Sequence, residues 1–326
     1  MKKALWVLAA AAFLLAACGV PGQPKAPARP TGPSPFNRWA IVVVGGDWRS
    51  TDGDETPIFD NARRDVAAAF LKAGFLSRNL AELSVNPGDD DGVEETNSRN
   101  FERLAGNVTD GARGCLFYFA SHGSEQGIVF GRREGLDPRT MNRLIDNWCG
   151  DKPTVVIVSA CHSGVFVPAL EGPNRMIMTA ARSDRSSFGC GGTDTYPYYD
   201  ACILESLPRS ADFIALSRKV KACIERREEE EDADPPSEPQ VSIGEDIERR
   251  LADMPFTDSS GESRRNADRD SNADRDRGGD DDRDRDSDRR RSWDDDRDYD
   301  RGDSERRDYD RDRGGDSDRR RERDYY

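Results

Sequence analysis

The sequence predicts an α/β fold with a mostly parallel sheet of about six strands, flanked by helices on both faces. Two observations predict it. The segments WAIVVVGG, CLFYFASHG and TVVIVSACHSG are continuous apolar runs that end in glycine or small polar residues, as do strands covered on both faces. Segments with helical spacing of apolar residues separate these runs, and such alternation is typical of a parallel sheet.

The other elements follow from local signals. IFDNARRDVAAAFLKAGF and NSRNFERLAGNV predict helices, LAELSV predicts a short strand, and GIVFG a short ribbon. DPRTMNRLIDNWCG predicts a helix with Asp137 as N-cap, Pro138 in its first turn and Gly150 at its end. RMIMTAA predicts a fourth strong strand, YYDACILESL and SADFIALSRKVKACIERREEEE predict helices, and PQVSIG and EDIERRLADM predict a last strand and a last helix.

We expect four parts along the chain, which are a signal peptide at 1–17, a proline-rich tether at 18–35, one folded domain at 36–256 and a disordered tail at 257–326. From residue 264 onward the tail holds 20 Arg and 24 Asp plus Glu, with no Lys, Val, Ile, Leu or Phe. Such a polyampholyte cannot bury enough apolar surface to fold. It serves either as a solubilising brush or as a docking segment.

The N-terminus predicts export and lipid attachment. Two lysines precede a short apolar run, and LAAC then fits a lipobox, so Cys18 is the expected lipidation site. An ordinary signal peptide with a chance cysteine is the alternative. The run is short for a transmembrane helix. Gly19, rather than Asp, favours an outer-membrane location facing the periplasm or the surface.

Charge and cysteine content limit the partners. The net charge of −14 argues against nucleic acid. Seven cysteines in an exported chain raise the question of disulfides, which the sequence does not assign. We expect Cys115 to be a small apolar strand residue, and a Cys190–Cys202 bridge is possible. No cysteine or histidine pair has zinc spacing, so we predict no metal or organic cofactor.

Two predicted strands end in reactive side chains. CLFYFASHG ends at His122 and Gly123, and TVVIVSACHSG ends at Ser159 and Cys161. Adjacent strands lie about 4.8 Å apart, and chemistry collects at the carboxyl ends of such strands. We therefore predict a nucleophilic thiol with an imidazole partner on one rim. A purely structural cysteine and histidine are the alternative.

The choice of partner and of chemistry has competitors. His162 is adjacent to Cys161, but successive residues of an extended chain point to opposite sides, which favours His122. A phosphatase loop would need arginine six residues after the cysteine, where Val167 stands. No phosphate-binding GxxxxGK[ST] loop and no HExxH zinc motif occurs.

At these residues the chain resembles the legumain-type cysteine peptidases of the caspase-like fold. YFASHG, VVIVSACHSG and MTAARSDRSSFGC carry the resemblance, and DNARRDVAAAFLKAGF and SEPQVSIG extend it. The resemblance implies that Cys161 attacks the scissile carbonyl, that His122 protonates the leaving amine, and that the N–H groups of Gly123 and Cys161 hold the oxyanion. It further implies substrate-binding positions, which are Asn61 or Arg63, Ser159, Ser187 and Asp200.

Asp200 would favour a basic or amide side chain of the substrate. Legumains carry an acidic residue two positions before the cysteine, whereas this chain has Ser159, which puts an asparagine preference in question. The expected function is a lipid-anchored cysteine endopeptidase acting on peptides or proteins. A transamidase of the same fold and a non-catalytic surface binding module are the alternatives.

Overall fold

The computed structural model describes residues 32–88, 90 and 92–257, all within one compact unit of the chain. The predicted signal peptide, the lipidation site and nearly all of the predicted tail lie outside these residues. Within the described ranges, every helix is too short or too polar to cross a bilayer.

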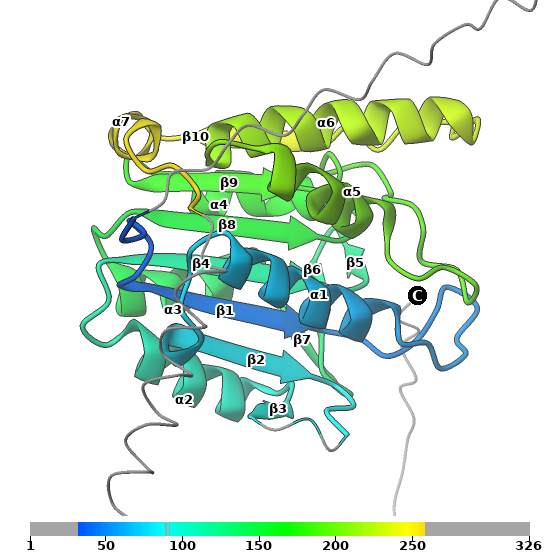
Figure 1. Ribbon diagram of the computed structural model, residues 1–326. Helices are drawn as coiled ribbons and strands as arrows, with labels where there is room; N and C mark the ends of the chain where they lie inside the picture. Colours follow the sequence, from blue (N-terminus) through cyan, green and yellow to red (C-terminus); the bar gives the residue numbers. More distant parts are fainter. Residues whose placement is uncertain (1–31, 89, 91, 258–326) are drawn as a thin grey trace, which may run out of the picture. The chain divides into compact units, whose positions relative to one another are not determined.

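A seven-stranded sheet forms the centre of the fold, in the order β10-β9-β8-β4-β1-β2-β3 (Figure 1). All pairs are parallel except β10 with β9. The predicted mostly parallel sheet is confirmed, with one strand more than the six expected. The strands are β1 (Trp39–Gly45), β2 (Leu80–Ser84), β3 (Val93–Glu95), β4 (Gly114–Ala120), β8 (Thr154–Ser159), β9 (Arg175–Thr179) and β10 (Gln240–Ile243).

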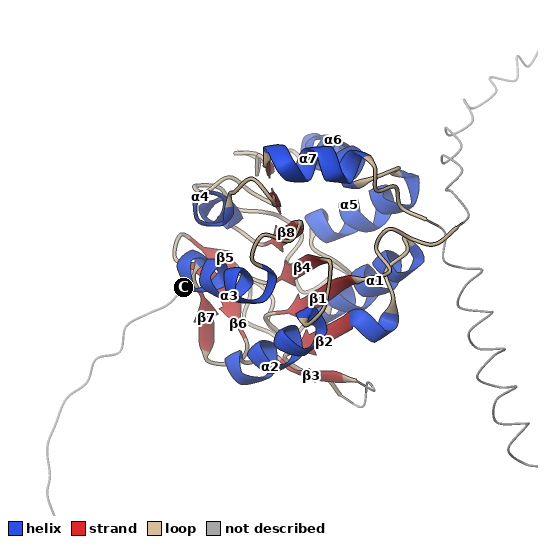
Figure 2. Cartoon of the chain, turned by 90° about the vertical axis from the view of Figure 1, so that its left-hand side faces the viewer, coloured by secondary structure: helices blue, strands red, loops and turns tan. Residues whose placement is uncertain are grey.

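Helices cover both faces of this sheet, as predicted, and the edge-on view of Figure 2 shows α1 and α5 on one side and α3 and α4 on the other. The helices are α1 (Ile58–Lys72), α2 (Ser98–Thr109), α3 (Pro138–Cys149), α4 (Val167–Leu170), α5 (Tyr198–Ser206), α6 (Phe213–Glu230) and α7 (Glu245–Ala252). Three 3-10 turns are η1 (Ser77–Asn79), η2 (Ser163–Phe166) and η3 (Leu207–Arg209).

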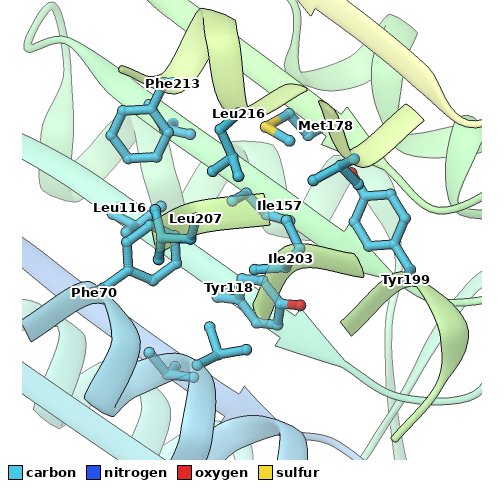
Figure 3. Packing of buried hydrophobic residues seen from close by; sticks show 14 of the residues in the cluster. Phe70, Leu116, Tyr118, Ile157, Met178, Tyr199, Ile203, Leu207, Phe213 and Leu216 are labelled. Carbon is cyan, nitrogen blue, oxygen red and sulfur yellow. The ribbon is translucent and has the colours of Figure 1, made fainter. Parts of the chain in front are cut away.

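The sheet separates two apolar cores because alternate residues of each buried strand point to opposite faces. One core packs β1, β4, β8 and β9 against α1, α5, α6 and α7. Figure 3 shows part of it, with Tyr118 of β4 among side chains that include Phe70 of α1 and Ile203 of α5. The other core packs the opposite strand faces against α2, α3 and α4. Central strands buried on both faces hold their ends rigidly.

Helix starts follow the predicted capping chemistry. The carboxylate of Asp137 accepts hydrogen bonds from the N–H groups of Arg139 and Thr140, and Gly150 ends α3 with a φ of 51°. Between β4 and α3 the chain forms a separate antiparallel sheet, and the predicted ribbon GIVFG is its middle strand. Its strands are β5 (Gly123–Ser124), β6 (Gly127–Phe130) and β7 (Glu134–Leu136).

The cysteine pairing differs from the sequence expectation. Cys115 at the start of β4 is bonded to Cys149 at the end of α3, so its interpretation as a lone apolar residue is wrong. Cys202 of α5 is bonded to Cys223 of α6, so the possible Cys190–Cys202 bridge is also wrong. In both cases helical packing, which the sequence does not show, brings the partners together. Among described residues, Cys161 and Cys190 are the free cysteines.

Candidate active site

The ends of β4 and β8 lie side by side, as the sequence predicted. Ala120 pairs with Ser159, and the N–H of Ser121 donates to the Ser159 carbonyl over 3.1 Å. The two segments that follow these strands therefore leave the sheet side by side. A Cβ atom on Gly123 would lie 2.2 Å from the Cys161 carbonyl oxygen, so only glycine fits at this contact. The His-Gly pair thus packs directly against the backbone of the candidate nucleophile.

Ser187 surrounds the sulfur of Cys161. The N–H of Ser187 donates to Sγ over 3.3 Å, and the Ser187 hydroxyl lies 3.5 Å from it. The Ser187 carbonyl oxygen, 3.6 Å away, accepts from the thiol when it is protonated. These contacts hold the sulfur against the Ser187 segment. Cys161 is half-buried, so the sulfur is both held and reachable.

A backbone carbonyl orients His122. Its Nε2 lies 2.9 Å from the carbonyl oxygen of Arg49, which follows β1. A carbonyl only accepts, so Nε2 carries a hydrogen and Nδ1 is the ring nitrogen left for proton transfer. The Phe59 ring meets the imidazole edge to face at a centroid distance of 4.9 Å. Two elements, the loop after β1 and the start of α1, therefore fix this ring.

His162 is engaged elsewhere. Its φ of 55° is left-handed, and the chain turns there from β8 into η2. Its Nδ1 donates to the Ser183 carbonyl over 3.0 Å, and its backbone N–H donates to the Arg185 carbonyl over 2.8 Å. The imidazole of His162 is thus tied to the loop that follows β9.

Ser159 and Asp200 form a buried pair with Tyr118. The hydroxyls of Ser159 and Tyr118 donate to separate oxygens of the Asp200 carboxyl over 2.6 and 2.5 Å. All three residues are buried, and none is more than 2% exposed. Burial raises the pKa of Asp200 to about 7, although both hydrogen bonds act to lower it. The predicted substrate positions Ser159 and Asp200 are therefore buried at the end of β8 and do not line an open surface.

The two alternatives near the start of α1 differ in exposure. Asn61 is partly exposed and its Nδ2 donates to the Thr195 carbonyl over 3.2 Å. Arg63 is 1% exposed, and its guanidinium is shared among three carboxylates. These carboxylates belong to Asp60, Glu82 and Asp90 at 2.9, 2.7 and 3.1 Å. Arg63 is therefore committed to the protein interior, while Asn61 can face a ligand.

Sequence reasoning missed the contributions of Arg49 and Phe59. The signal for Arg49 was present, since GGDWR closes the first strand as SHG and SACHSG close the other two. Its role is carried by a backbone carbonyl, which residue type does not reveal. Within the described residues, no group of three or more His, Cys, Asp or Glu side chains is arranged to hold a metal ion.

A held sulfur and an oriented imidazole, on adjoining segments at the carboxyl edge of a parallel sheet, fit the class of cysteine-dependent hydrolases. Residues 95–209 match the model of the Peptidase C13 family, and His122 and Cys161 both lie in this range. The resemblance to the legumain family is confirmed over these residues, and the match indicates a cysteine peptidase.

Two further comparisons complete these findings. The crystal structure of caspase-1 from Spodoptera frugiperda is similar, at 12% sequence identity and a TM-score of 0.47, over 69% of this chain and 93% of that chain. Among curated proteins, none matches the chain.

Proposed function

We propose that the protein is an envelope-located cysteine endopeptidase that hydrolyses peptide bonds through Cys161 and His122. One observation carries the proposal, namely the packing of the His122–Gly123 segment against the backbone of Cys161 at two neighbouring strand ends. The hydrogen bond from the Ser187 N–H to the sulfur supports the role of Cys161 as nucleophile. The contact of the Arg49 carbonyl with the imidazole supports the role of His122.

The reaction proceeds in two balanced steps. Nδ1 of His122 takes the proton of the Cys161 thiol as the sulfur attacks the scissile carbonyl carbon, a carbon–sulfur bond forms, and the N–H groups of Gly123 and Cys161 stabilise the oxyanion. The carbon–nitrogen bond then breaks while Nδ1 of His122 gives its proton to the leaving amine. Water next attacks the thioester and gives one proton to Nδ1 of His122. The carbon–sulfur bond breaks, the carboxylic product leaves, and His122 returns this proton to the sulfur, which restores the thiol.

Asn61 and Ser187 are the proposed substrate-contacting residues, with Ser159 and Asp200 supporting the strand end from behind. Asn61 is supported over Arg63 because the Arg63 guanidinium is buried among three carboxylates. Ser187 reaches the substrate from its position against the sulfur.

Anchoring through lipid on Cys18 and residence in the cell envelope are part of the proposal. Two disulfides, Cys115–Cys149 and Cys202–Cys223, support it because such bonds persist in oxidising compartments outside the cytosol. Growth with labelled palmitate should label the wild type and not Cys18→Ala. Equal labelling of both would exclude lipidation at this position.

A peptide-library digest tests the chemistry. Wild type should cleave peptides, and Cys161→Ala and His122→Ala should each lose at least about 10³-fold in kcat/KM. Cys190→Ala is the matched control, because it removes the other free cysteine and leaves the dyad intact. Cleavage that survives Cys161→Ala would end the peptidase proposal. Added amine nucleophile separates transamidation, which would yield the amine adduct instead of the acid.

A further inference from the structure

Asp47 is a buried carboxylate that the proposed mechanism does not use. Its side chain is 1% exposed, in the loop that follows β1. Oδ1 accepts from the backbone N–H groups of Trp48 and Arg49 at 2.7 and 3.2 Å. The Arg49 side chain donates to the same carboxylate through Nε at 3.2 Å and Nη2 at 3.3 Å. One carboxylate thus fixes both the backbone and the side chain of Arg49.

Arg49 is also the residue whose carbonyl oxygen holds Nε2 of His122 at 2.9 Å. The orientation of this carbonyl depends on the backbone that Asp47 fixes. Charge-assisted hydrogen bonds to a carboxylate are stronger and shorter than neutral ones, so the Asp47 carboxylate can hold the Arg49 backbone firmly. We propose that Asp47 is a positioning residue that acts through Arg49 to keep His122 in the orientation needed for proton transfer.

Further backbone contacts hold the loop that carries Asp47 and Arg49. The N–H of Thr56 donates to the Trp48 carbonyl over 2.9 Å, and Arg49 forms an antiparallel bridge with Glu55. The N–H of Thr51 donates to the Cys190 carbonyl over 3.1 Å, in the segment that continues from Ser187. The loop therefore contacts His122 and also the segment that holds the sulfur, and Asp47 secures its base.

The chemistry gives this role a distinct signature, which rests on the proposed function. An imidazole must lie within hydrogen-bond reach of the departing nitrogen to protonate it, and a small misplacement is costly. An amide leaving group needs that proton, whereas p-nitrophenolate leaves without it. Loss of Asp47 should therefore slow acylation by an amide far more than acylation by a p-nitrophenyl ester.

The test compares Asp47→Ala and Asp47→Asn in the full-length protein. The substrates are an amide and a p-nitrophenyl ester of one peptide that wild type cleaves. Asp47→Ala should lower kcat for the amide at least about 30-fold with KM changed less than about threefold, and lower the burst of p-nitrophenol release less than about threefold. Asp47→Asn keeps an acceptor oxygen for the two backbone N–H groups and should recover most of the amide activity.

Asp137→Ala is the matched control, since Asp137 also accepts two backbone N–H bonds but caps α3 without touching the loop. It should leave both rates near wild type. Equal losses on amide and ester, or unchanged amide activity in Asp47→Ala, would overturn the positioning role. A wild type that cleaves neither substrate, or cleaves them without Cys161, would instead overturn the proposed function, so the two failures are distinguishable.

Discussion

The hydroxyl of Ser159 donates a 2.6 Å hydrogen bond to the buried carboxyl group of Asp200, joining β8 to α5. Ser159 stands two residues before Cys161, at the position where legumains carry an acid. The carboxyl group comes from α5, and Tyr118 of β4 completes its hydrogen bonds. The carboxyl group of Asp200 is thus withdrawn from solvent.

This burial predicts a pH-dependent stability. Burial raises the pKa of Asp200 to about 7 from the ordinary 3.8. Between these values the folded state holds a proton that the unfolded state has lost, so stability falls as pH rises through this window. The upper limit is about 4 kcal/mol, at about 1.4 kcal/mol per pH unit.

Urea unfolding of wild type and Asp200→Asn from pH 4 to pH 8 measures the effect. The stability of wild type relative to the variant should fall as pH rises and become constant above about pH 7. A difference that does not change with pH, or that rises with it, would contradict the assignment.

The two free cysteines should react very differently with alkylating reagents. Cys161 is half-buried, with its sulfur facing the Ser187 N–H. Burial raises the pKa of the Cys190 thiol far above its ordinary range, and the electrostatic effect of nearby Cys161 raises it further. The reactive species is the thiolate. Iodoacetamide at pH 7.5 should therefore modify Cys161 at least about 100-fold faster than Cys190.

Mass spectrometry of the labelled peptides measures this ratio directly. Cys161→Ala should remove the fast phase, and Cys190→Ala should keep it. Preferential labelling of Cys190 in the native protein would contradict the burial of its side chain.

Strand existence and strand adjacency could be predicted from sequence because buried parallel strands leave continuous apolar runs. The ends of those runs located His122 and Cys161, and the structure brings their segments together. Helix α3 was equally clear, since its cap, its first-turn proline and its closing glycine are local signals.

Long-range packing could not be predicted in the same way. The pairing of Cys115 with Cys149 depends on how α3 lies on β4, and several pairings satisfied the sequence equally well. Strand β3 is three residues long and carries no apolar run. The withdrawal of Arg63 and Asp200 from solvent depends on partners 19 to 82 positions away in the chain. The support of His122 comes from a carbonyl group, which every residue possesses.

The disulfides predict a measurable share of stability. Cys202–Cys223 spans 21 positions and Cys115–Cys149 spans 34. Loop-closure entropy assigns each about 3–4 kcal/mol. Replacing Cys202 and Cys223 together by alanine should lower the free energy of unfolding by about 3 kcal/mol. Dithiothreitol should destabilise wild type by more than it destabilises this double variant, and an unchanged melting temperature of wild type under reduction would contradict the bridges.

Gly123 is a position where a single added methyl group should strongly reduce catalysis. A Cβ atom there would lie 2.2 Å from the Cys161 carbonyl oxygen and 2.9 Å from the Ala160 Cβ, and both belong to a rigid strand end. Gly123→Ala must therefore displace the backbone of the nucleophile or of His122, and removal of one aligned oxyanion donor alone typically costs about 10²–10³ in rate. We expect kcat/KM to fall at least about 10²-fold. Gly135→Ala is the matched control, because its Cβ would meet Ile128 at an ordinary 3.5 Å in the same small sheet. It should keep wild-type kinetics, and equal activity of the two variants would show that the His-Gly segment does not pack on Cys161.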